Sequence, residues 1–96
     1  MSWFFADCSN IRKIDMTNFD TENINDMAGI FGRCKCLKKI NLSNFNTENV
    51  NDMRCMFCGC KSLTNIDLSN FNTKNSTYME DMFWGCNSLI KKYIIN

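Results

Sequence analysis

The sequence predicts an α/β solenoid of about 3.7 coils of 26 residues, with short parallel strands on one side and short helices on the other. Three features predict this class: a strict internal repeat, a strand-like alternation within each repeat, and a helix-like spacing in the remainder of each repeat. The 96 residues form a single repeat domain, with units at 1–26, 27–52, 53–78 and 79–96, of which the last is partial.

Apolar residues recur every 26 positions without any gap. A fixed period of this length is the signature of a repeat protein. The clearest columns are Met1, Met27, Met53 and Met79; Phe5, Phe31, Phe57 and Phe83; Cys8, Cys34, Cys60 and Cys86; and Ile14, Ile40 and Ile66. Since one such unit cannot bury its apolar side alone, we expect the units to stack and to share a continuous core.

The stretch "LKKINLSNF" predicts the strand of the second unit. Its alternation, with Ile40 and Leu42 on one side, is typical of a short strand that has one buried face. The repeat then predicts strands at 13–16, 39–42 and 65–68, with neighbouring strands parallel and about 4.8 Å apart.

The last unit departs from this pattern, because strict repetition would bury Lys92. A buried charge without a partner costs several kcal/mol. We therefore expect the fourth strand to be short or to slip by one residue. Ile90, Tyr93 and Ile95 would then restore the apolar spacing.

The stretch "NDMAGIFGRC" predicts a two-turn helix. Its apolar residues Met27, Ile30, Phe31 and Cys34 follow the spacing i, i+3, i+4, i+7, which is one face of a helix. Applied to the other units, the pattern predicts helices near 26–34, 52–60 and 78–86, and a shorter one at the N-terminus.

Polar residues recur around these elements as well. We expect N-caps at Asn25, Asn51 and Thr77, and we expect Asp26 and Asp52 to place negative charge at the positive helix ends. Two asparagine columns and one threonine column should satisfy each other and the turn backbone where the chain leaves the sheet. These columns are Asn18, Asn44 and Asn70; Asn23, Asn49 and Asn75; and Thr21, Thr47 and Thr73.

The stretch "MFCGCKSLTNIDLSNFNT", with "NVNDM" in the unit before it, resembles the BspA-like leucine-rich repeat family of bacterial surface proteins, whose 26-residue repeats are of the DUF285 type. The resemblance covers residues 1 to about 90. It implies a right-handed, leucine-rich-repeat-like solenoid. It also implies a cell-surface or extracellular location and a role in adhesion, with a host or matrix protein as partner.

Neither end of the chain has the polar cap that solenoids normally carry. We therefore expect the chain to be a fragment of a longer array. The alternative is a complete short protein whose copies pair end to end.

Composition narrows the function classes. Eleven basic and ten acidic residues give a net charge of +1, which attracts neither nucleic acid nor anionic lipid. No apolar run approaches the roughly 20 residues that span a bilayer, so membrane insertion is not expected. There is no histidine and no catalytic constellation, so we expect neither an enzyme nor a cofactor.

The outer face of the sheet is the candidate interaction face, because repeat solenoids bind partners on extended, regular surfaces. We expect a protein partner there. Three rows form the face: Lys13, Lys39 and Asn65; Asp15, Asn41 and Asp67; and Thr17, Ser43 and Ser69.

Seven cysteines leave a second hypothesis open, a cysteine-dependent metal or redox protein. Cys55 and Cys58 could offer two thiolates, but a closed zinc site needs four ligands. We expect free thiols, with Cys36, Cys55 and Cys58 reactive and the cysteines of the repeated column protected. A third hypothesis is an intracellular scaffold that uses the same solenoid.

Overall fold

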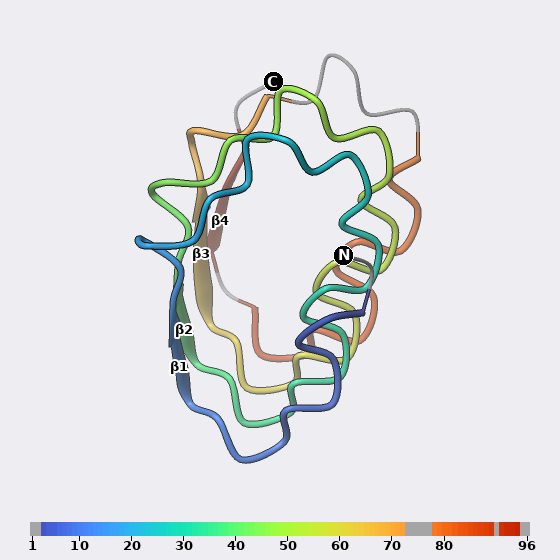
Figure 1. Ribbon diagram of the computed structural model, residues 1–96. Coiled ribbons are helices and arrows are strands. Elements are labelled where there is room, and N and C mark those ends of the chain that lie inside the picture. The colour runs from blue at the N-terminus through green and yellow to red at the C-terminus, as the bar shows by residue number, and fades with distance from the viewer. Residues whose placement is uncertain (1–2, 73–77, 90, 95–96) are drawn as a thin grey trace.

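The computed structural model describes residues 3–72, 78–89 and 91–94, the last range by its backbone alone. The strands are β1 (Lys13–Asp15), β2 (Lys39–Asn41), β3 (Asn65–Leu68) and β4 (Lys91–Ile94). The first three coincide with the predicted strands to within one residue. Figure 1 shows the strands on one side of the molecule and tightly wound turns on the other, with successive units following the same course.

No helix occurs in the part of the chain that the structure describes, so the predicted helices near 26–34, 52–60 and 78–86 and at the N-terminus are wrong. Consecutive turns occupy this side instead, at 3–7, 28–33, 54–59 and 80–85. We call these four segments the turn stack.

Hydrogen bonds in the turn stack run partly within a unit and partly between units. The N–H of Ile30 donates to the Met27 carbonyl at 3.2 Å, which closes one turn. The N–H of Phe31 donates to Met56 in the next unit at 3.0 Å. Because alternate N–H groups bind the neighbouring unit, the bonds of a continuous α-helix cannot form.

The backbone torsions explain the same result. Each unit has two residues with positive φ, four positions apart, whereas an α-helix needs negative φ throughout. These positions form two columns: Trp3, Gly29, Cys55 and Asp81; and Asp7, Arg33, Gly59 and Gly85. The turns still point residues at the predicted spacing into the core, so the apolar pattern was correct although the element was not.

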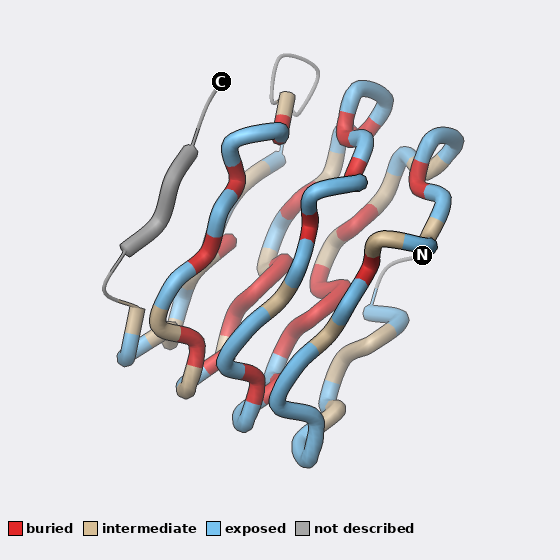
Figure 2. The backbone as a smooth tube through the Cα atoms, turned by 90° about the vertical axis from the view of Figure 1, so that its left-hand side faces the viewer, coloured by how far each residue is buried: buried red, intermediate tan, exposed pale blue. Residues whose placement is uncertain are grey.

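The core lies between the strands and the turn stack. Figure 2 shows buried residues alternating with exposed ones along the strand side. Phenylalanine rings stack through the centre: Phe31 lies 5.5 Å from Phe57 and 5.8 Å from Phe5, measured between ring centroids. Phe57 stacks in turn on Phe83 at 5.6 Å, so the ring column crosses all four units.

The sheet is not continuous, contrary to our expectation. β1 pairs with β2 and β3 pairs with β4, both in parallel, but no ladder joins β2 to β3. Units two and three are held together by the turn stack and by the bridge between Asp52 and Tyr78 at its edge. The Asn70 side chain also crosses the interruption and donates to the Leu42 carbonyl at 3.0 Å.

The expected slip of the fourth strand is also wrong. Ile66 pairs with Lys92 and Asp67 with Tyr93, which is the strict 26-residue register, and β4 is as long as β3. The side chains of 91–94 and residues 90 and 95 lie outside the described part of the chain. The backbone therefore keeps the period where the side-chain pattern predicted a shift.

Several members of the polar columns bond the turn backbone, which is one half of their predicted role. Asn70 and Asn49 donate from their side chains to backbone carbonyls of the preceding unit, and Asn44 donates to the Thr17 carbonyl. Thr21, buried at 2 % exposure, accepts from the Asn46 N–H at 2.8 Å and donates to the Asn46 carbonyl. Thr73, Asn75 and Thr77 lie outside the described residues.

The first turn of the segments at 28–33 and 54–59 is capped by aspartate rather than by asparagine. Asp26 accepts from the Ala28 N–H at 3.0 Å, and Asp52 accepts from the Arg54 N–H at 3.1 Å. Asn25 instead accepts the Asn51 N–H through its backbone carbonyl. The predicted caps were therefore displaced by one residue.

Candidate interaction site

The strands place the predicted face toward solvent. In β1 and β2 the side chains of Lys13, Asp15, Lys39 and Asn41 are exposed, while the central isoleucine is half-buried. β3 has the same alternation, with Asn65 and Asp67 exposed. The period-two geometry of a strand is the reason for this sorting.

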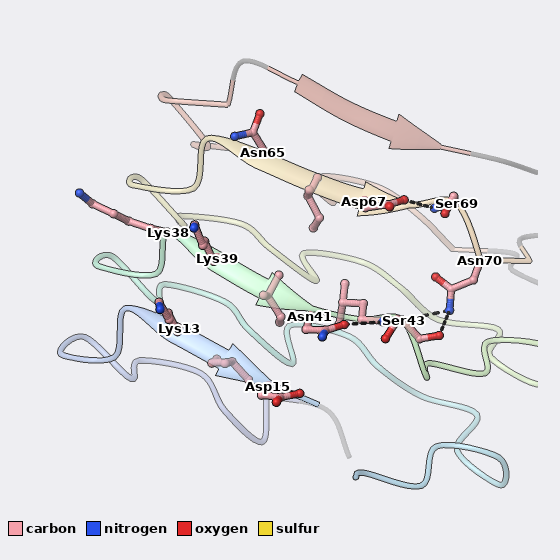
Figure 3. A pocket seen from close by; sticks show the side chains of 14 residues that line it. Lys13, Asp15, Lys38, Lys39, Asn41, Ser43, Asn65, Asp67, Ser69 and Asn70 are labelled. Carbon is pink, nitrogen blue, oxygen red and sulfur yellow. Dashed lines mark hydrogen bonds between the residues drawn. The ribbon is translucent and has the colours of Figure 1, made fainter. Parts of the chain in front are cut away.

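These side chains line a hollow of ≈ 680 Å³ that spans β1 to β3. Eight of the nine predicted face residues belong to its lining: Lys13, Asp15, Lys39, Asn41, Ser43, Asn65, Asp67 and Ser69. Thr17, the ninth, is outside it. Figure 3 shows the lining side chains along β1, β2 and β3. The hollow thus extends across the interruption between β2 and β3.

Sequence reasoning missed Lys38 and Asn70, which also line the hollow. A signal for Lys38 was present, because a pair of basic residues precedes the strand alternation in the first two units. Asn70 was assigned only to a structural column. Its side-chain amide donates to the Ser43 carbonyl at 3.1 Å and to Phe45 at 2.9 Å, besides Leu42.

The row of Asp15, Asn41 and Asp67 has a structural task. Each side-chain Oδ1 accepts the backbone N–H two residues later: Asp15 that of Thr17 at 3.0 Å, Asn41 that of Ser43 at 3.0 Å, and Asp67 that of Ser69 at 2.9 Å. Such bonds turn the chain at the strand ends. For each carboxylate, Oδ2 is the oxygen that a ligand could contact.

Hydrogen bonds also set the charge of this row. The pKa of the Asp15 carboxyl lies below its usual value because the backbone N–H and then the side chain of Thr17 donate to it. The pKa of Asp67 is lowered in the same way by the side chain and backbone of Ser69. Both groups are therefore anionic at neutral pH and suited to accept hydrogen bonds or to pair with cations.

Opposite charges lie at different ends of the hollow. Lys13 and Lys39 begin their strands, and Asp15 and Asp67 lie two residues further along theirs. Two strand residues span about 6–7 Å. The hollow therefore has its lysines at one end and its aspartates at the other, along the strand direction. Half-buried Ile40 supplies apolar surface between them, whereas Ile66 lies almost wholly in the core. The arrangement suits a partner that has both charges and an apolar portion.

The cysteines divide into two groups. Cys34, Cys60 and Cys86 donate their S–H groups to the carbonyls of Phe5, Phe31 and Phe57, at 3.2, 3.1 and 3.0 Å. The repeated column is thus a hydrogen-bonded ladder, and its central members Cys34 and Cys60 are buried as expected. A thiol is kept there because it is small, apolar and a donor.

The remaining cysteines differ in exposure. Cys36 is exposed and Cys55 is half-buried, and their reactivity stays a prediction. Cys58 is buried at 7 % exposure, and burial, followed by its hydrogen bond to Cys55, raises its pKa to about 12. Cys58 is therefore less accessible than its predicted reactivity assumed, and that reactivity stays a prediction. Among the described residues, no group of three or more candidate metal ligands comes together.

A family model for a "Mycoplasma protein of unknown function, DUF285" matches residues 1–94. The chain belongs to this family. No curated protein and no solved structure matches it. The match confirms that the repeat is of the DUF285 type. It names no activity. Within the described ranges of this DUF285 chain, no helix has the length and apolar character needed to cross a membrane.

Proposed function

We propose that this chain is a non-enzymatic repeat module that binds a protein partner through the outer face of its strands. The observation that carries the proposal is the hollow, because eight residues assigned to that face from the sequence pattern line one concavity. Its carboxylates accept hydrogen bonds that favour the ionised form, which suits recognition better than acid catalysis.

We also propose that the fold is a right-handed solenoid of the BspA-like leucine-rich repeat class, acting in adhesion at the cell surface. The parallel pairing of β1 with β2 and of β3 with β4, at offsets of one unit, supports it. A host or matrix protein is then the expected partner. End-to-end self-association stays a further prediction, which sedimentation over a range of concentrations would test.

An intracellular scaffold would use the same hollow. The surface-adhesion and intracellular-scaffold hypotheses differ in the cellular compartment of the protein and not in the chemistry of its binding face. Antibody labelling of intact cells, compared with permeabilised cells, distinguishes them, because a surface protein is labelled without permeabilisation.

Binding can be tested with a panel of matrix proteins, namely fibronectin, fibrinogen, laminin and collagen, passed over the immobilised chain. We expect saturable binding to one of them, weakened about ten-fold or more by Lys13→Glu combined with Lys39→Glu. The matched control is Lys35→Glu with Lys61→Glu, because both lysines are exposed and outside the hollow. Equal losses in the two double variants would contradict the assignment of the site.

A further inference from the structure

Cys55 and Cys58 interrupt the repeat on the outer side of the turn stack. Their counterparts are Gly29 and Gly32 in the second unit, whereas the cysteines of the ladder recur in every unit. The ladder cysteines have a structural task that explains their presence, as donors to buried carbonyls. The pair in the third unit has no such repeated task.

The backbone brings the two cysteines together. The N–H of Cys58 donates to the Cys55 carbonyl at 3.2 Å, so the two residues are the first and last of a single β-turn. The Cα atoms that end such a turn lie within about 7 Å of each other, which overlaps the range that a disulfide spans. The side chains lie close enough to interact as well, since Cys55 is one of the causes that raise the pKa of Cys58.

The two thiols differ in access. Cys55 is half-buried and can meet a small reagent, whereas Cys58 is shielded from solvent. The Arg33 backbone N–H donates to the Cys58 carbonyl at 2.7 Å, and the Arg33 charge offsets only part of the burial that raises the pKa of Cys58. Cys55 is therefore the thiol that a disulfide reagent can reach, and Cys58 is the shielded neighbour that can attack the Cys55 sulfur afterwards.

We propose that Cys55 and Cys58 form a redox-active dithiol that is oxidised to an internal disulfide by low-molecular-weight disulfides. In the first step the Cys55 thiolate attacks one sulfur of the reagent RSSR, giving a Cys55–S–S–R mixed disulfide and releasing RSH. Cys58 then loses its proton, attacks the Cys55 sulfur and releases the second RSH. In total, two protein thiols are oxidised and one RSSR is reduced to two RSH, and excess RSH reverses both steps.

The test uses the folded full chain in buffers that contain reduced and oxidised glutathione in varied ratios. Remaining thiols are alkylated after an acid quench. Cleavage after Arg54 and Lys61 yields the peptide "CMFCGCK", which contains Cys55, Cys58 and Cys60. We expect this peptide to carry an internal disulfide between Cys55 and Cys58, with Cys60 alkylated only after unfolding. The bond should disappear with excess reduced glutathione.

Variants identify the order of attack. Cys58→Ser should stop the reaction at a stable glutathione adduct on Cys55, whereas Cys55→Ser should give neither the adduct nor the bond. Cys36→Ser, an exposed cysteine elsewhere, is the matched control and should oxidise like the wild type. Full alkylation of Cys55 and Cys58 at every ratio, a bond to Cys60, or a persistent adduct in the wild type would each overturn the proposal. Mapping the wild-type peptide decides it even where a variant does not fold.

Discussion

The indole ring of Trp3 lies directly on the backbone of Gly29 in the next unit. A Cβ atom on Gly29 would be 2.2 Å from Trp3 Cδ2, far inside van der Waals contact. The Trp3 N–H of the backbone also donates to the Ala28 carbonyl at 2.8 Å, and the Arg33 guanidinium lies 5.4 Å from the centre of the ring. The Trp3 ring thus lies between the Gly29 backbone and the Arg33 guanidinium. Trp3 therefore joins the first two units.

Gly29→Ala should destabilise the protein for two reasons. Gly29 has a φ of +62°, which costs an alanine about 1–2 kcal/mol, and the added methyl group must displace Trp3. Gly85→Ala is the control, because Gly85 also has positive φ but an added Cβ there meets nothing closer than 3.4 Å. Urea denaturation should therefore show the larger loss for Gly29→Ala. Equal losses would mean that Trp3 does not rest on the glycine.

Phe57→Ala should lower the free energy of unfolding by roughly 3–5 kcal/mol. Phe57 is fully buried and stacks on Phe31 and Phe83, so the truncation opens a cavity in the middle of the ring column. Lys39→Ala, on the exposed face, should cost less than about 0.5 kcal/mol. Comparable losses in equilibrium unfolding would show that the columns are assigned wrongly.

The strands and the core could be predicted from the sequence because they depend on period and alternation alone. Ile66 and Phe57 fall into place as soon as the 26-residue repeat is recognised. The turn stack could not be distinguished from helices in this way. Consecutive turns and a helix both direct residues spaced like Ile30 and Cys34 inward, and the difference lies in the sign of φ.

Glycine residues were the sequence feature that could have indicated positive φ, but they occur at only some of the positions that have it. Gly29, Gly59 and Gly85 occupy the two columns with positive φ, but Arg33 and Cys55 occupy the same columns in other units. The alternation of apolar and polar residues predicted the exposed face. It could not predict the hollow, because a repeat predicts equal spacing of all strands and gives no reason for β2 and β3 to be unpaired.

Stability should fall as the pH rises above about 9. Burial raises the pKa of the Cys60 thiol to about 12, above the 9.0 of an accessible thiol. Between these values the unfolded chain releases the proton and the folded chain keeps it, so proton release favours unfolding. Urea midpoints measured from about pH 8 to pH 11 should decline, and Cys60→Ala should decline less steeply. Identical slopes for the two proteins would show that Cys60 does not contribute.

Asn70→Ala should weaken the connection between β2 and β3, and it should lower the free energy of unfolding more than the loss of an exposed asparagine with a single hydrogen bond would. The Asn70 amide shares its two N–H groups among the carbonyls of Leu42, Ser43 and Phe45, where no ladder joins the strands. Removing a partner of buried or half-buried carbonyls costs about 1–3 kcal/mol. Asn49→Ala is the matched control, because its amide donates to the exposed Glu22 carbonyl and its loss should cost less. Hydrogen exchange should also accelerate at Phe45 and Phe71 in Asn70→Ala, and unchanged exchange there would show that the side chain does not hold the two units together.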